Sequence, residues 1–303
     1  MLRPRGPSAH TVDLLWWAML AISVVVFAVV LAMTLVAIAR RRRPMAEEER
    51  AEPRWGSSFI AIAGVVIPVM VLGSMSVISL RELLEIDSRP STLRIDVVGH
   101  MWWWEARYPN GALTANEIHV PVGQTVGVHL STADVIHSFW VPQLAPKLDM
   151  VPGMRNTLTL QADAPGRYRG QCAEFCGLQH AHMAFFVVAQ PAAEFDAWLA
   201  AQAAPAPTPA SSVGREGQSV FLTSTCAGCH TIRGTEADAT LGPDLTHLAS
   251  RSTIASGTLE NTRDNLSAFI TAPQSIKPGA VMPPTRLSPS QLAALLDYLE
   301  TLR

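Results

Sequence analysis

Residues 172–183 gather four side chains that bind soft metal ions. The stretch reads CAEFCGLQHAHM and contains two thiols, an imidazole and a thioether, at Cys172, Cys176, His180 and Met183. Sulfur ligands combined with imidazole select copper or zinc over hard cations. His137, in the segment DVIHSFW, can supply another imidazole from a neighbouring turn. The pattern predicts a metal centre on a loop between two strands.

Zinc and a disulfide are the two alternatives to copper at this position. A structural zinc site needs four ligands in a closed tetrahedron. It would leave Met183 without a role, because a thioether binds copper better than zinc. A disulfide between Cys172 and Cys176 is the default for paired cysteines in an oxidising compartment. The neighbouring ligands favour copper over both, and His182 is expected to be a surface residue or a neighbour of the ligands and not itself a ligand.

Residues 226–230 carry a second signature, CAGCH. This pattern is typical of covalent attachment of a c-type haem through Cys226 and Cys229, with His230 as an iron ligand. Met282 is the only methionine between residues 213 and 303 and can supply the sixth iron ligand. His/Met ligation raises the haem potential, which suits an electron carrier. A zinc knuckle that uses His247 is the alternative, and it would leave Met282 without a role.

The residues around the first signature favour short strands. Alternating or β-rich runs are separated by proline- and glycine-containing turn signals and occur at 93–98, 125–131, 156–161 and 185–188. Many short strands separated by such turn signals predict an antiparallel sandwich over residues 91–190.

The character of the chain changes after residue 190. Residues 193–204 predict a short amphipathic helix, and the sequence PAPTPASS at 205–212 predicts a semi-rigid tether. Further on, the apolar spacing predicts helices over 214–223 and 288–302. The second signature therefore belongs to a mainly helical region.

Two N-terminal segments are long and apolar enough to cross a bilayer. Residues 14–39 and 57–80 contain no charged side chain, and a spanning helix needs about 20 apolar residues. Buried core helices are one alternative. A cleaved signal peptide is another for the first segment, but its apolar run is too long and ends in four arginines at 40–43.

The loop between these segments predicts the orientation of the chain. It holds six arginines against four glutamates, and short basic loops stay on the cytoplasmic side. The N-terminus and everything after residue 80 should therefore lie outside. A net charge of −2 predicts no partner by bulk electrostatics, and we expect no nucleic-acid partner.

Residues 92–189, with the two preceding helices, resemble subunit II of haem–copper cytochrome c oxidases. The family motif is an outlying His followed by C-x-E-x-C-x3-H-x2-M, and it matches at every ligand position. The resemblance implies that two thiolates bridge two coppers in a CuA centre and that each copper has one histidine. It also implies two weak axial ligands, and the full set is Cys172, Cys176, His137, His180, Met183 and the carbonyl of Glu174.

Three more roles follow from the same resemblance. The Glu174 side chain would face a magnesium ion shared with subunit I. Trp102 would lie between the electron donor and the copper centre, with packing inside the sandwich as the alternative. Glu52 would mark the mouth of a proton channel into subunit I, although it also stands beside other solvated glutamates.

Residues 213–303 resemble small class I cytochrome c domains. The resemblance implies that Gly217 and Phe221 pack against Leu295 and Tyr298, and that residues 242–243 line the proximal side of the haem. A haem domain directly behind a CuA domain resembles the fused subunit II of caa3-type oxidases.

We therefore expect a multidomain membrane protein with four parts. They are a two-helix transmembrane hairpin, an all-β Greek-key (cupredoxin-like) sandwich, a helix with a linker, and an all-α class I cytochrome c domain, at 1–90, 91–190, 191–212 and 213–303.

The expected function is electron transfer from a cytochrome c-type donor, through haem c and CuA, to the oxygen-reducing site of subunit I. Subunit III is a further expected partner, and the expected location is a bacterial inner membrane with both metal domains on the periplasmic side. The alternatives are the CuA-bearing small subunit of a nitric oxide reductase, an anchored electron carrier without its own oxidase, and a copper-delivery module.

Overall fold

The computed structural model describes residues 3–41, 55–88 and 90–303, and the chain divides into two compact units. One unit spans residues 10–89, and the other consists of residues up to 9 together with 90–303. Glu52 lies outside the described residues.

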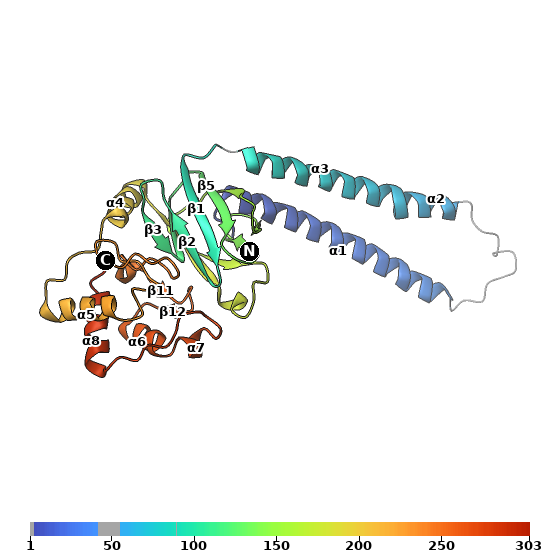
Figure 1. Cartoon of the computed structure of the whole chain (residues 1–303). Coiled ribbons are helices and arrows are strands. Elements are labelled where there is room, and N and C mark those ends of the chain that lie inside the picture. Colours follow the sequence, from blue (N-terminus) through green and yellow to red (C-terminus); the bar gives the residue numbers. More distant parts are fainter. Residues whose placement is uncertain (1–2, 42–54, 89) are drawn as a thin grey trace. The chain divides into compact units, whose positions relative to one another are not determined.

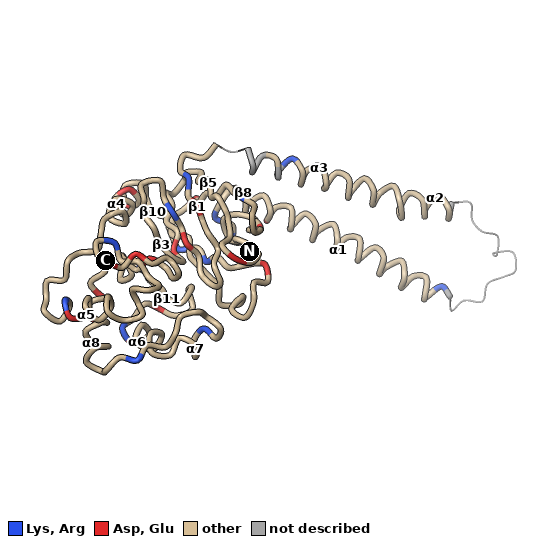
Figure 2. The backbone as a smooth tube through the Cα atoms, viewed as in Figure 1, with Lys and Arg blue, Asp and Glu red and all other residues tan. Residues whose placement is uncertain are grey.

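The smaller unit is helical (Figure 1). Its first helix is α1 (Pro7–Arg41), and its second consists of α2 (Trp55–Ala61), the π-helical turn η2 (Ile62–Val66) and α3 (Ile67–Ser88). The stretches Pro7–Arg40 and Gly56–Arg81 are long and apolar enough to cross a membrane. Charged residues are confined to the ends of the helices (Figure 2). The apolar windows are not buried within the described chain, as lipid-facing helices require.

The second of these helices differs from the expectation in two respects. It continues to Ser88, beyond the predicted end at 80, and it contains the π-helical turn at Ile62–Val66. Nearly every position in this region is apolar, so the hydrophobic pattern has no periodicity that could separate a π turn from an α turn.

A β-sandwich forms the first part of the larger unit, as predicted. One sheet has the order β3-β2-β1-β5-β8 and the other β4-β10-β9-β6-β7. The bounds of the ten strands are β1 Leu93–His100, β2 Trp103–Arg107, β3 Leu113–Ala115, β4 Glu117–Pro121, β5 Val126–Thr132, β6 His137–Trp140, β7 Leu148–Met150, β8 Asn156–Leu160, β9 Gly166–Cys172 and β10 Ala184–Gln190.

The expectation of purely antiparallel pairing was wrong. β1 pairs with β5 in parallel, and β4 pairs with β10 in parallel. Parallel neighbours need a long crossover connection. The strands between each pair supply that connection, and local sequence patterns do not record which distant strands become neighbours.

The core of the sandwich lies directly beneath the first signature. The rings of Trp104, Phe139 and Phe185 meet with centroids 4.6 to 5.9 Å apart, and all three are buried. Cys172, Cys176 and Met183 belong to the same apolar cluster. Aromatic packing of this kind holds the strands beneath the loop rigidly.

The C-terminal part of the larger unit is mainly helical and has its own apolar cluster. Its helices are α5 (Ser212–Thr223), α6 (Arg263–Thr271), α7 (Pro273–Ile276) and α8 (Pro289–Leu299), and a short hairpin joins β11 (Thr253–Ile254) to β12 (Leu259–Glu260). Ser288 and Gln291 form a capping box at the start of α8. The rings of Phe221 and Tyr298 lie 6.3 Å apart, which agrees with the expected packing of the first helix on the last.

The segment after α4 (Ala192–Ala203) is held more firmly than the predicted tether. The backbone N–H of Ala206 donates to the carbonyl of Arg233. The guanidinium of Arg233 donates to the carbonyls of Gln202 and Ala203, which satisfies the free end of α4. The linker therefore lies against the helical part, because that part supplies partners for its backbone.

His119 on β4 gives the sandwich a predicted pH dependence. Its ring stacks on Trp198 of α4 at 3.9 Å, and its Nδ1 lies 2.7 Å from Oε1 of Gln190. Burial lowers the pKa of His119 below its usual 6.5, so unfolding takes up a proton in acid. The free energy of unfolding should therefore fall as the pH drops below about 6.5.

The measurement compares unfolding curves of the wild type and His119→Phe between pH 8 and pH 5. The phenyl ring keeps the stack but cannot titrate. The variant should lose less stability than the wild type over the acid half of this range. Parallel curves for the two proteins would contradict the prediction.

Candidate metal and haem sites

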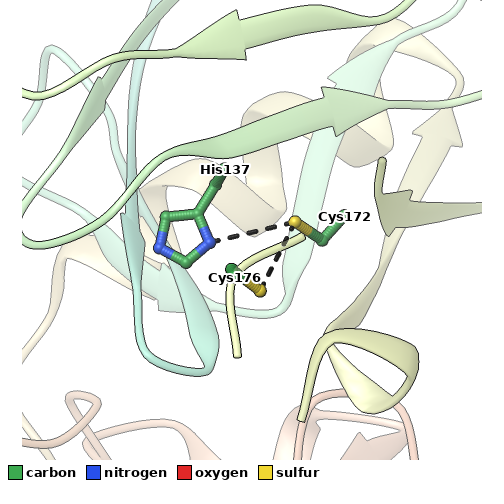
Figure 3. A group of neighbouring side chains, drawn as sticks. All are labelled: His137, Cys172 and Cys176. Carbon is green, nitrogen blue, oxygen red and sulfur yellow. Dashed lines mark hydrogen bonds between the residues drawn. The ribbon is translucent and has the colours of Figure 1, made fainter. Parts of the chain in front are cut away.

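The loop after β9 brings two thiols beside His137, which begins β6 (Figure 3). The Sγ atoms of Cys172 and Cys176 are 3.7 Å apart, far beyond the roughly 2.05 Å of a disulfide bond. Sγ of Cys172 lies 3.8 Å from Nδ1 of His137. All three residues are buried, and their ligand atoms lie within 4.8 Å of one another.

Three further donors surround the same pair of thiols. Sγ of Cys176 lies 3.7 Å from Nδ1 of His180 and 3.8 Å from Sδ of Met183. The carbonyl oxygen of Glu174 lies 3.1 Å from Sγ of Cys172. The whole set therefore converges on two sulfur atoms, and each sulfur has its own histidine.

The electrostatics of the pair favour a bound cation. Contact with the Cys176 thiol and with His137 lowers the pKa of Cys172 well below its usual range. Contact with Cys172 and burial raise the pKa of Cys176. Two buried thiolates this close would repel each other. Soft cations bound to both sulfurs would remove that repulsion, so the donor set fits copper.

A carboxylate orients the histidine on β6. Nε2 of His137 lies 2.8 Å from Oδ1 of Asp134, which directs Nδ1 towards the sulfurs. Burial opposes a charged imidazole, but the Cys172 and Asp134 contacts raise the pKa of His137 overall. Oδ2 of Asp134 accepts from the backbone N–H of Met101. Asp134 is not among the residues predicted from the sequence, because its only local signal is its place three residues before a histidine.

Two tryptophans bond to the backbone of the metal-binding loop. The indole N–H of Trp102 donates to the carbonyl of Cys176 at 2.8 Å. The indole N–H of Trp104 donates to the carbonyl of Met183 at 3.4 Å. Trp102 is 9% exposed, so it is a packed residue that also touches the backbone of a candidate ligand.

The second signature forms a compact turn after α5. The backbone N–H groups of Cys229 and His230 both donate to the carbonyl of Cys226, and the two cysteines are not joined in a disulfide. Nδ1 of His230 lies 2.8 Å from the carbonyl of Pro243, which leaves Nε2 on the opposite side of the ring. Burial lowers the pKa of His230, which favours the neutral imidazole that iron binds.

The surroundings of His230 also fit a haem. A Cβ atom at Gly242 would lie 2.5 Å from Cε1 of the imidazole, so only glycine allows this approach. Leu241 and Val281 are 77% and 86% exposed and offer apolar surface that a haem would cover. Met282 is half-buried and packs, with Cys226, against the second apolar cluster.

His247 does not join the second signature. Its Nε2 lies 3.0 Å from the carbonyl of Ala204, so it supports the linker. Within residues 3–41, 55–88 and 90–303, no group of three His, Cys, Asp or Glu ligand atoms includes it together with Cys226 and Cys229. The arrangement therefore does not favour the zinc-knuckle alternative.

Known proteins resemble both parts of the larger unit. The family described as "Cytochrome C oxidase subunit II, periplasmic domain" matches residues 112–190, and the family "Cytochrome c" matches residues 214–303. "Cytochrome c oxidase subunit 2" of Alkalihalophilus pseudofirmus is 36% identical, over 100% of this chain and 90% of the relative. The chain belongs to the cytochrome c oxidase subunit 2 family. The proteins of the same name from Bacillus sp. PS3 and Bacillus subtilis are 33% and 32% identical, over 87% of this chain and 80% of each relative.

Membership in the cytochrome c oxidase subunit 2 family accounts for both metal-binding signatures and for the two apolar helices. The chain is a membrane protein and a subunit of an oxidoreductase complex. Its two family matches cover both metal-binding signatures.

Asp134 should strengthen copper binding by holding the His137 ring in place. Removing the carboxylate in Asp134→Ala should free the His137 ring and weaken copper binding by about 10–100-fold, as loss of such partners usually does. Copper content after dialysis against a graded series of chelator concentrations measures this. Asp134→Asn keeps an acceptor oxygen and should retain more copper. Wild-type retention in Asp134→Ala would show that the carboxylate does not hold the imidazole.

Proposed function

We propose that this chain is the subunit of a haem–copper cytochrome c oxidase that accepts electrons from a cytochrome c-type donor and delivers them to subunit I, where oxygen is reduced to water. The convergence of three side chains and one carbonyl on the paired thiols of Cys172 and Cys176 carries this proposal. Protein donors surround the pair, which suits electron transfer and leaves little room for a substrate.

The proposed copper centre has two ions. Cys172 and Cys176 would hold both ions through their thiolates, His137 and His180 would each hold one ion, and Met183 and the Glu174 carbonyl would be weaker ligands. The near-symmetric distances from the thiols to the two histidines support this assignment. The proposed haem is bound covalently by Cys226 and Cys229, with His230 and Met282 as iron ligands.

The bound copper and haem supply reversible one-electron chemistry. The protein contributes by holding their ligands in place, and two contacts perform that task. Asp134 fixes the His137 ring, and the carbonyl of Pro243 fixes the His230 ring. Burial of the thiols and of Met183 excludes water, so the surroundings need little rearrangement when the charge changes.

Further proposals concern the complex. The Glu174 side chain would face a magnesium ion at the boundary with subunit I, Trp102 would lie on the electron path, and Glu52 would mark a proton channel. Subunit III would be a further partner. The basic loop at 40–54 supports an inner-membrane protein of a bacterium with both metal domains on the periplasmic side.

Gas consumption by the purified complex tests the function. The complex, isolated in mild detergent, is supplied with reduced cytochrome c, and oxygen and nitric oxide consumption are measured separately. We expect oxygen uptake, with copper and haem c present in the chain. Nitric oxide consumption without oxygen uptake would replace the oxidase by a nitric oxide reductase. Absence of both would leave an anchored electron carrier.

A further inference from the structure

Lys277, in the helical part, is buried against the sandwich. It is 3% exposed, and its Nζ donates to the carbonyl of Trp102 at 2.7 Å and to Oγ of Ser256 at 2.9 Å. The carbonyl of His182 lies 3.4 Å away. Two of these three acceptors belong to the part that carries the thiols, so the lysine joins the two parts.

The surroundings of Lys277 differ from those of an ordinary buried lysine. Its three acceptors are neutral, and within the described chain it forms no ion pair with a carboxylate. Burial lowers the pKa of Lys277 to about 7. Burying an ammonium without a counter-ion is costly. A contribution to the stability of the fold therefore does not explain why a lysine occupies this position.

The hairpin between β11 and β12 reaches the same carbonyl from another direction. Ser256, at its tip, donates through Oγ to the carbonyl of Trp102 at 2.6 Å and accepts the backbone N–H of Ala184. Ala255 and Ser256 have φ angles of 52° and 57°. Two successive non-glycine residues in the left-handed region cost energy, and such residues persist where the surroundings fix them.

The turn after Lys277 lies on the metal-binding loop. The side-chain amide of Gln179 donates to the carbonyl of Pro278 at 2.8 Å. A Cβ atom at Gly279 would lie 2.9 Å from Leu178 and 3.7 Å from the Trp102 ring. The chain reaches Met282, the proposed haem ligand, three residues later. The same turn therefore adjoins a proposed haem ligand and contacts the loop that holds the thiols.

Glu117 fixes the base of the hairpin. Its carboxylate accepts from the backbone N–H of Ser252 at 3.0 Å and from the Ser252 hydroxyl. Arg167 donates to the same carboxylate and to Thr253. The hairpin is therefore bound to the sandwich at its base and at its tip.

We propose that Lys277 and Ser256 form a clasp on the Trp102 carbonyl that holds the Met282 loop against the metal-binding loop. Lys277 is thereby a positioning residue for electron transfer within the chain. This inference rests on the proposed function. A single electron passes from the haem-binding part to the copper-binding part. No proton moves and no bond breaks.

The clasp also covers Trp102. Its carbonyl is bonded to Ser256 and Lys277, and its indole is bonded to Cys176 and lies beside Gly279. A soluble donor therefore meets the haem-binding part first, because Trp102 has little exposed surface. The positioning of that path is thereby assigned to two residues that are not themselves ligands.

Amine labelling of the intact complex tests the docked state without any activity measurement. The chain has two lysines, the exposed Lys147 and the buried Lys277. With an amine-reactive reagent at pH 8 and peptide mass mapping, Lys147 should react and Lys277 should be protected. An exposed Lys277 should react as readily as Lys147, so its protection reports burial.

Ser256→Ala removes the hydroxyl that both donates to Trp102 and accepts from Lys277. Labelling of Lys277 should rise about tenfold in this variant, because the loss of the two hydrogen bonds of this hydroxyl raises the undocked population by about that factor. Labelling of Lys147 should not change. Equal labelling of the two lysines in the wild type, or unchanged protection in Ser256→Ala, would overturn the clasp.

Lys277→Met and the matched control Lys147→Met test the effect on electron transfer. After a light pulse reduces the haem, its reoxidation and the reduction of copper are followed by absorbance. The rate should fall about tenfold in Lys277→Met, because the lost bond to the Trp102 carbonyl shifts the Met282 loop and a small misplacement of a positioned group can cost at least this much, and it should not change in Lys147→Met. An unchanged rate in Lys277→Met, with full copper and haem, would overturn the positioning role. Absence of copper or haem from the wild type would instead defeat the proposed function.

Discussion

Replacing Cys176 by serine should abolish copper-dependent electron transfer. Sγ of Cys176 lies within 4 Å of three other donors, which belong to Cys172, His180 and Met183. A hydroxyl is a hard, neutral ligand that binds copper poorly. We expect Cys176→Ser to lose at least one of two coppers and oxygen uptake with reduced cytochrome c to fall about 100-fold or more, beyond the usual effect of losing an outer partner.

The copper and haem content of the purified complex measures this result together with oxygen uptake. Haem c should remain attached, because Cys226 and Cys229 belong to a separate apolar cluster. His182→Ala is the matched control, since His182 stands beside the loop but its side chain is exposed. Two coppers in Cys176→Ser would show that this thiol does not bridge them.

The sequence predicts the two signatures well because most of their ligands are close in the chain. Five of the six proposed copper ligands lie within residues 172–183, and Cys226, Cys229 and His230 lie within one turn. Local chemistry alone therefore indicates the kind of metal. His137 is 35 residues from Cys172, and only the family resemblance assigned it a specific role. The structure places it beside Cys172.

The contacts that orient these ligands could not be predicted from the sequence. Lys277 and Trp102 are 175 residues apart, and a lysine next to a proline in a loop looks like any solvated surface residue. The parallel pairing of β1 with β5 is hidden for the same reason. Such contacts depend on which distant segments meet, and no periodicity in a single segment records that.

The composition of the linker predicts its lack of secondary structure but not its contacts. Its proline-rich composition correctly predicts a segment that forms no helix or strand of its own. Composition does not show that Arg233 would bond to the end of α4, or that the N–H of Ala206 would find an acceptor. A segment without internal hydrogen bonds is open to partners elsewhere, and here it has them.

Gly217→Ala should strongly destabilise the haem-binding part. A Cβ atom there would lie 1.9 Å from the carbonyl oxygen of Ala294 and 2.7 Å from Cβ of Tyr298. The first of these atoms belongs to the backbone of α8, so the two helices would have to separate. Overpacking usually costs about 1–3 kcal/mol and here should reach the upper end, while alanine regains only about 1 kcal/mol of helix propensity.

Thermal unfolding followed at the haem absorbance measures the effect in the full chain. Gly217→Ala should unfold at a lower temperature and bind less haem, whereas Ser219→Ala, an exposed position of the same helix, should match the wild type. Copper content should change little, because the thiols belong to the sandwich core. Because α5 leads directly into the CAGCH turn, separating it from α8 would also displace His230. An unfolding temperature equal to that of the wild type would mean that α5 and α8 do not cross this closely.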